Sequence, residues 1–259
     1  MNTLQTMKNK AKEVLNKPQG KTLVVVSTNQ ISNNLKRIVF EDLSNTLRSE
    51  HESGYLKLQF TQAEQTVLRS YTILETYQEA DKNYVVIDFV IHEGGFGAQW
   101  AKHAAVGDVL NVKGPGDAKL VNTELDWFFL IGDLTSLPAI TVNLKVLPKD
   151  AKGYAVIEVL DKSDILELEK PDGIEIEWVI NSNPSESAQL ILSKIQAKDW
   201  LEGTPYIWLA SEFESARTLR QYFRKEKQAN KTHFYVSSYW KLGETDEGNK
   251  RAKRADGQF

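Results

Sequence analysis

The chain has 259 residues, 41% hydrophobic and 26% charged, with a formal net charge of -3 at pH 7. This composition fits a globular protein of one large or two ordinary domains, and the small net charge gives no reason to expect nucleic acid as a partner. The absence of cysteine excludes disulfides, thiolate nucleophiles and cysteine-held metal or iron–sulfur sites, so any redox chemistry must come from a bound cofactor. The four histidines lack ligand spacing, so no protein-held metal is expected.

Residues 1–20 form a lysine-rich lead that is expected to contain a short helix. No run reaches the length of a membrane-spanning helix, and the N-terminus lacks the apolar core of a secretory signal. We therefore predict a cytoplasmic protein that does not insert into a membrane.

Residues 21–122 are dominated by short runs rich in Val, Ile, Leu, Tyr and Phe, separated by polar breaks. No long helix intervenes, which favours an antiparallel barrel of six strands. A short helix is expected at 98–105, between the last two strands, where a ligand-binding helix would be well placed. The six runs are 21–32, 34–43, 55–62, 65–74, 82–93 and 107–116.

Residues 123–243 follow another pattern, because strands and helices now alternate. The run "WFFLIGD" is nearly continuous in apolar residues, as buried parallel strands are, and "SLPAITVNLKVL" follows at helical spacing. This alternation predicts an α/β domain with a mostly parallel sheet. Residues 244–259 then form a basic tail, expected to be partly mobile.

The strand segment "RSYT" places three unlike side chains together. Arg69 could pair with a phosphate, Tyr71 could lie against a planar ring, and Thr72 could meet a heteroatom at the edge of that ring. An edge strand with an exposed arginine and a half-buried tyrosine would give the same pattern.

The segment "HEGGFGAQWAKHAA" brings glycines directly before a helix. Gly94, Gly95 and Gly97 allow a tight turn that exposes backbone amides, and free amides at a helix start form an anion site suited to a pyrophosphate. A simple glycine turn from strand to helix is the alternative.

The segment "FLIGDLTSLPAI" lies where the first strand of the α/β domain meets its first helix, the usual ligand-binding edge of an open parallel sheet. Pro138 fits a first helical turn, and Thr135 or Ser136 could cap it. Only Gly132 is available here, so the G-x-G-x-x-G phosphate fingerprint is missing. A capped helix start without a ligand remains an alternative.

The tail carries an excess of positive charge. Across the last ten residues, Lys250, Arg251, Lys253 and Arg254 stand against Asp256 alone, a local charge of +3. Such a patch would attract a polyanionic ligand by long-range steering, or it could simply keep a mobile tail in solution.

Taken together, "RSYT", "HEGGFGAQWA", "GPGDAKL", "GDLTSLPAI", "WLASEFESARTLRQYFRKE" and "SSYWKLG" resemble the siderophore-interacting proteins, a branch of the ferredoxin-reductase-like flavoproteins. The resemblance runs from about Lys21 to Gly243. It implies an FAD-binding barrel, a nucleotide-binding-like α/β domain, and reduction of ferric siderophores with NADH, NADPH or reduced ferredoxin as donor. The chain departs from the family where a proline is frequent, at Phe96 or Gly97, and where Leu134 replaces a glutamate.

The resemblance also implies site residues. No side chain is expected to be catalytic, since the flavin would transfer the electrons. Glu212 is marked because its turn is similar to one near the nicotinamide. The expected FAD and donor residues are Arg69, Ser70, Tyr71, Thr72, His92, Gly94, Gly95, Phe96, Gly97, Ala98, Asp133 and Thr135. The expected substrate residues are Tyr239, Trp240, Lys241, Lys250, Arg251, Lys253 and Arg254.

Two other functions fit the same residues. The first is a general NAD(P)H:flavin or ferredoxin-type reductase whose acceptor is a protein. The second is a non-catalytic module that sequesters ferric siderophore on its basic tail. The basic tail favours a siderophore over a protein acceptor.

Overall fold

The computed structural model describes residues 21–62 and 64–257, so the expected lead helix within residues 1–20 lies outside the described part. The chain divides into two compact units, Met1–Ala118 and Lys119–Phe259. The sequence pattern predicts the change of architecture between residues 122 and 123.

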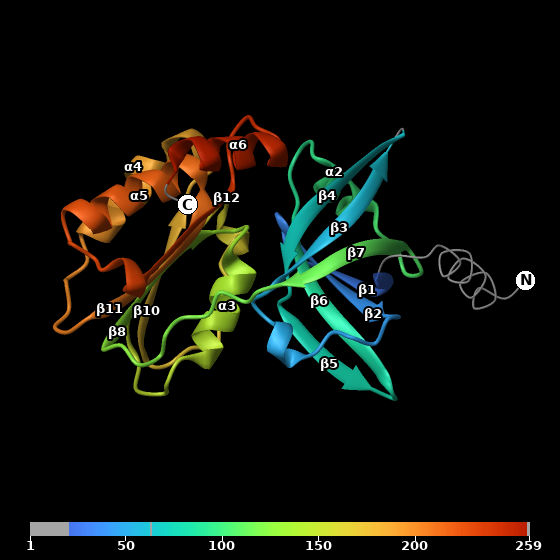
Figure 1. Cartoon of the computed structure of the whole chain (residues 1–259), viewed down its shortest axis with the longest axis horizontal. Coiled ribbons are helices and arrows are strands. Elements are labelled where there is room, and N and C mark those ends of the chain that lie inside the picture. Colours follow the sequence, from blue (N-terminus) through green and yellow to red (C-terminus); the bar gives the residue numbers. More distant parts are fainter. Residues whose placement is uncertain (1–20, 63, 258–259) are drawn as a thin grey trace, which may run out of the picture. The chain divides into compact units, whose positions relative to one another are not determined.

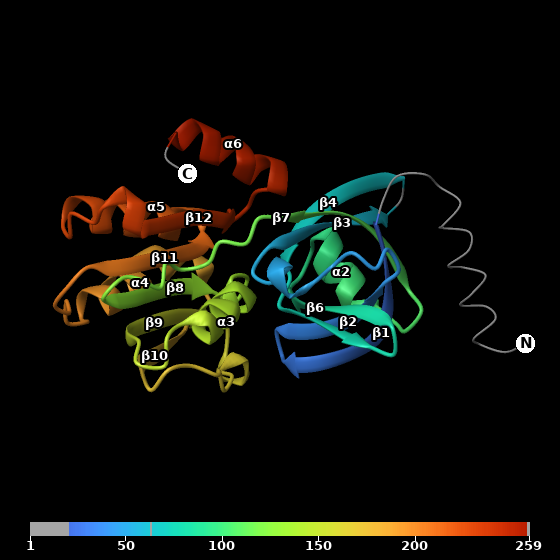
Figure 2. The same cartoon turned by 60° about the horizontal axis from the view of Figure 1, so that its bottom comes forward.

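The first unit contains a seven-stranded antiparallel sheet in its described residues, with strand order β4-β3-β7-β1-β2-β6-β5. The sheet curls into a barrel (Figures 1 and 2), and the Leu74 amide, between β4 and β5, donates to the Val86 carbonyl oxygen of β6 at 3.0 Å. The strands are β1 (Lys21–Ser32), β2 (Leu35–Asp42), β3 (Tyr55–Gln62), β4 (Gln65–Thr72), β5 (Glu75–Glu79), β6 (Lys82–Val90) and β7 (Val109–Gly116).

The expected strand count of six is therefore corrected to seven. The additional strand, β5, has the sequence "ETYQE" and is largely exposed at the edge of the sheet. It lacks the apolar run by which the other six were recognised, because an edge strand with little buried surface needs none.

The barrel interior is filled by alternate side chains of its strands and by one helix, α2 (Phe96–His103). Phe40, Leu58 and Phe89 are fully or almost fully buried there, and Ala101 of α2 joins the same cluster. The described elements of this unit are completed by the 3₁₀ turn η1 (Ser49–His51).

The second unit is the expected α/β domain. Its five strands are all parallel, in the order β10-β9-β8-β11-β12. The strands are β8 (Trp127–Asp133), β9 (Lys152–Val159), β10 (Gly173–Ile180), β11 (Pro205–Glu212) and β12 (Phe234–Trp240). The helices are α3 (Leu137–Val146), α4 (Ser187–Gln196), α5 (Phe213–Lys225) and α6 (Asp246–Asp256), with 3₁₀ turns η2 (Lys162–Asp164), η3 (Pro184–Glu186) and η4 (Lys231–His233).

The strand order decides where this sheet would accept a ligand. From β8 the chain moves through β9 to β10 on one side, and it then crosses to β11 and β12 on the other side. Because crossovers are right-handed, α3 covers one face of the sheet while α4 and α5 cover the opposite face. The connections from β8 and from β11 lead toward opposite edges of the sheet. The carboxyl ends of these two parallel strands therefore flank the topological switch point, where open α/β sheets bind ligands.

No helix in the described residues is both long and apolar enough to cross a membrane. Within the same residues, no group of three potential metal ligands occurs.

Candidate functional site

Strand β4 carries the first set of expected site residues. Arg69 and Tyr71 lie on the same face of the strand and are half-buried, whereas Ser70 on the other face is exposed and Thr72 at the strand end is buried. A guanidinium N–H of Arg69 donates to the Leu68 carbonyl oxygen at 2.9 Å, which holds the side chain against its own strand.

The Tyr71 ring packs into an aromatic group inside the barrel. Its centroid lies 4.4 Å from the ring of Phe89 and 6.0 Å from the ring of Phe60. Burial raises the pKa of the Tyr71 phenol, and the Arg69 charge opposes this only partly, so the hydroxyl remains protonated at neutral pH. The hydroxyl is therefore a hydrogen-bond donor in this site.

The glycine loop leads into α2 with two residues in the left-handed region, Gly94 at φ 76° and Gly95 at φ 78°. Gly95 is the N-cap residue, and no side chain caps the helix. A Cβ atom at Gly94 would meet nothing within 4 Å, so the space beside Gly94 is open.

These features fit a pyrophosphate. The first-turn amides of a helix have no intrahelical acceptor, and at α2 they belong to Phe96, Gly97 and Ala98. Arg69 and Tyr71 lie in the same unit of the chain. The residues expected to bind FAD in this unit thus supply a helix start with uncapped amides, a guanidinium and an aromatic hydroxyl.

Three neighbours of the loop have packing contacts. The exposed His92 lies beside the loop, with its Cε1 atom 3.1 Å from the position of a Cβ at Gly95. Phe96 is half-buried against the barrel core. Trp100 stacks on Phe40 with centroids 6.2 Å apart, and this contact packs the helix onto the barrel.

The second unit brings Asp133 to the switch point. Its carboxylate is 6% exposed and accepts four hydrogen bonds, two of them on Oδ1, from the Thr135 amide at 2.9 Å and the Thr135 hydroxyl at 2.5 Å. Oδ2 accepts from the Glu212 amide at 2.9 Å and from the Trp240 indole at 2.8 Å. Asp133 therefore links the carboxyl ends of β8, β11 and β12.

Burial raises the pKa of Asp133, while the donors from Thr135, Trp240 and Glu212 oppose that increase. The expected cap of α3 takes another form. Ser136 holds the N-cap position without capping the helix, and its hydroxyl accepts from the Asp133 amide at 3.1 Å and donates to the Asp133 carbonyl oxygen at 3.0 Å.

The β8–α3 turn is closely packed. A Cβ at Gly132 would lie 2.0 Å from the Ser136 hydroxyl and 2.8 Å from the Ala210 carbonyl oxygen. Gly132 thus allows the helix and β11 to approach the strand, and the space beside it is filled by protein atoms rather than left open for a phosphate.

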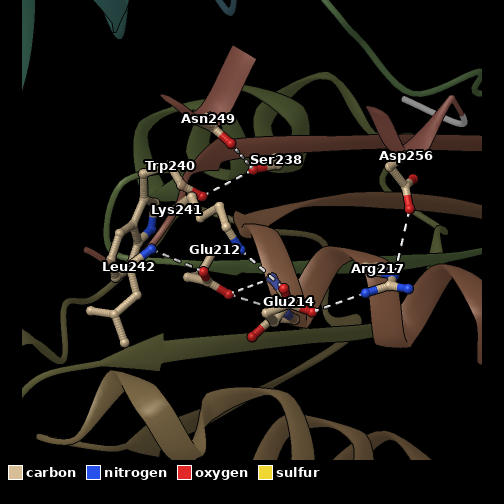
Figure 3. Close-up of polar contacts among 10 residues, drawn as sticks. Glu212, Glu214, Arg217, Ser238, Trp240, Lys241, Leu242, Asn249 and Asp256 are labelled. Atoms are coloured by element: carbon tan, nitrogen blue, oxygen red, sulfur yellow. Dashed lines mark hydrogen bonds and ion pairs between the residues drawn. The ribbon is translucent and has the colours of Figure 1, made fainter. Parts of the chain in front are cut away.

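Glu212 acts as the N-cap of α5 and as an anchor for the chain after β12 (Figure 3). One carboxylate oxygen accepts from the amides of Glu214 at 2.5 Å and Ser215 at 3.2 Å, and the other accepts from the Leu242 amide at 3.1 Å. These contacts are structural, so Glu212 shapes this edge of the sheet.

The expected substrate residues at the end of β12 and directly after it are partly committed to the fold. Lys241 lies 3.0 Å from Glu214 and 4.3 Å from the centroid of the Phe213 ring, and Tyr239 is half-buried.

The tail forms the helix α6 rather than a mobile segment over the described residues. It docks on the second unit through polar groups: the Ser238 hydroxyl lies 2.8 Å from Asn249 Oδ1, and Lys253 donates to Ser237 at 3.0 Å (Figure 3 shows the Asn249 contact). Lys250 pairs with Asp246 on its own helix.

The last turn of α6 contacts α5. Asp256 lies 2.6 Å from Arg220, which is only 1% exposed, and 3.5 Å from Arg217. Arg220 belongs to a charged run that normally indicates a solvated helix face, so nothing in the sequence identified it as buried. Arg251 and Arg254 are exposed on α6.

A second buried carboxylate was missed by the sequence analysis. Glu158, near the end of β9, accepts from Asn181 at 2.5 Å and Ser187 at 2.6 Å. Burial raises its pKa, the charges of Asp133 and Glu212 raise it further, and the two hydrogen bonds oppose the increase. An acidic residue inside the apolar run "GYAVIEVLD" was the available signal.

Glu158→Gln should change the pH dependence of stability. Because the folded-state pKa lies above the ordinary value of 4.5, the folded protein binds the proton more tightly than the unfolded chain. The free energy of unfolding of the wild type should therefore fall relative to the variant as pH rises from about 4.5, by at most about 1.4 kcal/mol per pH unit. Urea unfolding of both proteins between about pH 4 and pH 8 measures this, and a pH-independent difference would contradict it.

Comparison with known proteins agrees with this arrangement. Residues 125–243 match the family model described as siderophore-interacting protein, and residues 41–119 match the one described as siderophore-interacting FAD-binding domain. The ferric vibriobactin reductase ViuB of Vibrio cholerae is 30% identical over 205 residues, which cover 75% of this chain and 74% of the relative.

A second curated relative and a solved structure support the same family. The NADPH-dependent ferric-chelate reductase of Escherichia coli is 30% identical over 175 residues, covering 66% of this chain and 65% of the relative. The crystal structure of a siderophore utilization protein from T. fusca superposes with a TM-score of 0.80 at 27% identity, covering 90% of this chain and 96% of that structure.

The strand topology and the matched family models define a two-domain protein with an N-terminal FAD-binding domain. The chain belongs to the siderophore-interacting protein family.

Proposed function

We propose that this protein is an FAD-dependent reductase of ferric siderophores that releases iron in the cytoplasm. The observation that carries the proposal is the open glycine loop at the start of α2, in the same unit as Arg69 and Tyr71, within a segment that matches an FAD-binding domain. The names of the Vibrio cholerae and Escherichia coli relatives support a ferric complex as substrate.

The chemistry follows from the metal. Siderophores bind Fe(III) through hard anionic oxygen donors, and these donors suit Fe(II) less well, so one electron is enough to weaken the complex. FAD, when bound, accepts electrons in pairs and delivers them singly. The chain itself would bind the diphosphate with the α2 amides and Arg69, and would orient the ring with Tyr71 and Thr72.

NADH or NADPH is the proposed electron donor, with reduced ferredoxin as the alternative. The name of the Escherichia coli relative supports NADPH. Asp133 and Thr135 at the switch point are the residues proposed to border the nicotinamide. The Trp240 indole donates a hydrogen bond to the Asp133 carboxylate.

The basic residues of α6 are proposed to attract an anionic ferric siderophore. Arg251 and Arg254 are exposed, whereas Lys253 is bonded to Ser237 and Lys250 to Asp246. The first two therefore remain the residues most suited to steering, and Tyr239, Trp240 and Lys241 are proposed as the adjoining aromatic and cationic surface.

Reversing the charge at Arg251 and Arg254 should raise the KM for an anionic ferric siderophore about tenfold at low salt, with less effect at high salt. A ferric siderophore without net negative charge is the matched control and should be unaffected. Deleting α6 would be a poorer experiment, because it would also remove Asp256 from the buried Arg220. An unchanged KM for the anionic substrate would exclude these two residues from substrate attraction.

The proposed function is tested by the visible spectrum of the purified protein, followed anaerobically after NADH, NADPH and then a ferric siderophore. We expect flavin bands that bleach with a nucleotide and return with the ferric complex. Bleaching only by reduced ferredoxin would identify a protein donor. A colourless protein that cannot be reconstituted with FAD would contradict the proposal.

A further inference from the structure

Gly97 is a glycine that its backbone does not require. Gly94 and Gly95 have φ values of 76° and 78°, in the region that favours glycine, but Gly97 has no positive φ and lies in the first turn of α2. Alanine stabilises helices better than glycine does, so a residue with a side chain would favour this helix. The reason for the glycine must therefore lie in what surrounds it.

The space beside Gly97 is occupied by Tyr71. A Cβ atom at position 97 would lie 2.0 Å from the Tyr71 hydroxyl oxygen, 3.1 Å from Cζ of the same ring and 3.4 Å from Cε2 of Phe60. The first of these distances is far below van der Waals contact. An alanine is thus compatible with the backbone at this position and incompatible with the Tyr71 hydroxyl.

The Tyr71 ring has little freedom to move aside. It is packed against Phe89, with centroids 4.4 Å apart, and against Phe60 in an edge-on arrangement at 6.0 Å. Both neighbours are buried in the barrel core. A new Cβ at position 97 would therefore displace either the tyrosine from its packing or the start of α2 from the barrel.

This contact joins the two halves of the FAD site. Tyr71 lies on β4 beside Arg69, and Gly97 supplies one of the first-turn amides of α2. A single dinucleotide would have to reach the ring-binding strand and the phosphate-binding helix start at the same time, so its affinity depends on how far apart they are held.

We propose that Gly97 is a positioning residue for FAD, which sets the distance between the start of α2 and strand β4 by admitting the Tyr71 hydroxyl against the helix. The inference rests on the proposed function in requiring FAD as the ligand. Gly97 then acts on the flavin ring through Tyr71, in addition to offering its own amide to the phosphates.

The inference makes a distinction between ligands. FAD occupies both halves of the site, whereas ADP carries a diphosphate without a flavin ring. A shift of the helix start relative to β4 should weaken FAD binding more than ADP binding.

A double-mutant cycle tests the contact. Tyr71→Phe removes only the hydroxyl, so that the nearest atom to a new Cβ is Cζ at 3.1 Å. Dissociation constants for FAD and ADP would be measured by fluorescence for the wild type, Gly97→Ala, Tyr71→Phe and the double variant. Thermal unfolding of the four flavin-free proteins serves as the control for folding.

We expect Gly97→Ala to weaken FAD binding about tenfold when Tyr71 is present, in line with the usual cost of overpacking, and about twofold or less when position 71 carries phenylalanine. The effect on ADP should be smaller than that on FAD. If Gly97→Ala does not fold, the double variant should fold and bind FAD about as well as Tyr71→Phe.

Three results would overturn the inference: equal losses of FAD affinity in both backgrounds, equal losses for FAD and ADP, or no loss at all. A double variant that also fails to fold would overturn it as well. A wild-type protein that binds no FAD would instead contradict the proposed function.

Discussion

Replacing Arg69 with alanine is expected to weaken FAD binding about a hundredfold. A half-buried guanidinium that bonds a phosphate makes charge-assisted hydrogen bonds, and truncating one partner of such a pair typically costs about 2–5 kcal/mol. A hundredfold loss of affinity lies within this range, because each tenfold change corresponds to about 1.4 kcal/mol. FAD content of the purified protein and titration of the flavin-free form measure the loss. Arg69→Lys should recover only part of it, because lysine restores the charge without the planar fork.

Arg48→Ala is a matched control for this variant. Arg48 is exposed on the same unit, and like Arg69 it donates to the carbonyl oxygen of the preceding residue, at 2.7 Å. Its replacement removes the same charge and the same kind of backbone contact from outside the proposed site. Full FAD occupancy in Arg69→Ala, or equal losses in the two variants, would contradict a phosphate-binding role for Arg69.

Most of the fold could be predicted from local patterns. The six apolar runs of the first unit are strands because each buries alternate side chains in the barrel, and β8 is a continuous apolar run because both faces of a central parallel strand are covered. The strand β5 escaped prediction because its exposed edge position demands no hydrophobic pattern. Elements that bury little surface leave little trace in a sequence.

The helix α6 shows a related limit. Its start has ordinary signals, since Thr245 accepts from the Gly248 amide at 3.1 Å and acidic residues occupy the first turn. Its docking depends on Asn249 and Asp256, whose partners Ser238 and Arg220 lie on other elements, β12 and α5. Polar docking of this kind has no periodic signature, so the sequence analysis described a basic tail.

The two candidate sites also differ in how far local sequence patterns predict them. The residues expected to bind FAD in the first unit fall in two short motifs, each of which suggests its chemistry by itself. The role of Asp133 depends on contacts with Glu212 and Trp240, which lie 79 and 107 residues further along the chain. Spacing within a motif could indicate that Asp133 matters, but only the strand order brings its partners to it.

Asp133→Ala is expected to lower the free energy of unfolding of the second unit by about 3 kcal/mol or more. The substitution removes the acceptor from four donors, and each buried donor left without a partner costs about 1–3 kcal/mol. It also releases the Trp240 indole from the switch point, so the near-UV circular dichroism of the tryptophans should change. Urea unfolding and the near-UV spectrum measure the two effects.

Asp126→Ala provides the matched control, because Asp126 directly precedes β8 at its opposite end, is exposed, and accepts the Thr204 amide at 2.6 Å. Its loss should cost about 1 kcal/mol or less, since water can replace an exposed acceptor. Trp240→Phe should reproduce the spectral change of Asp133→Ala with a smaller loss of stability, because it removes one of the four hydrogen bonds. If Asp133→Ala were no more destabilising than Asp126→Ala, the carboxylate would not be what joins the ends of β8, β11 and β12, and Trp240 would need another anchor at the proposed nicotinamide site.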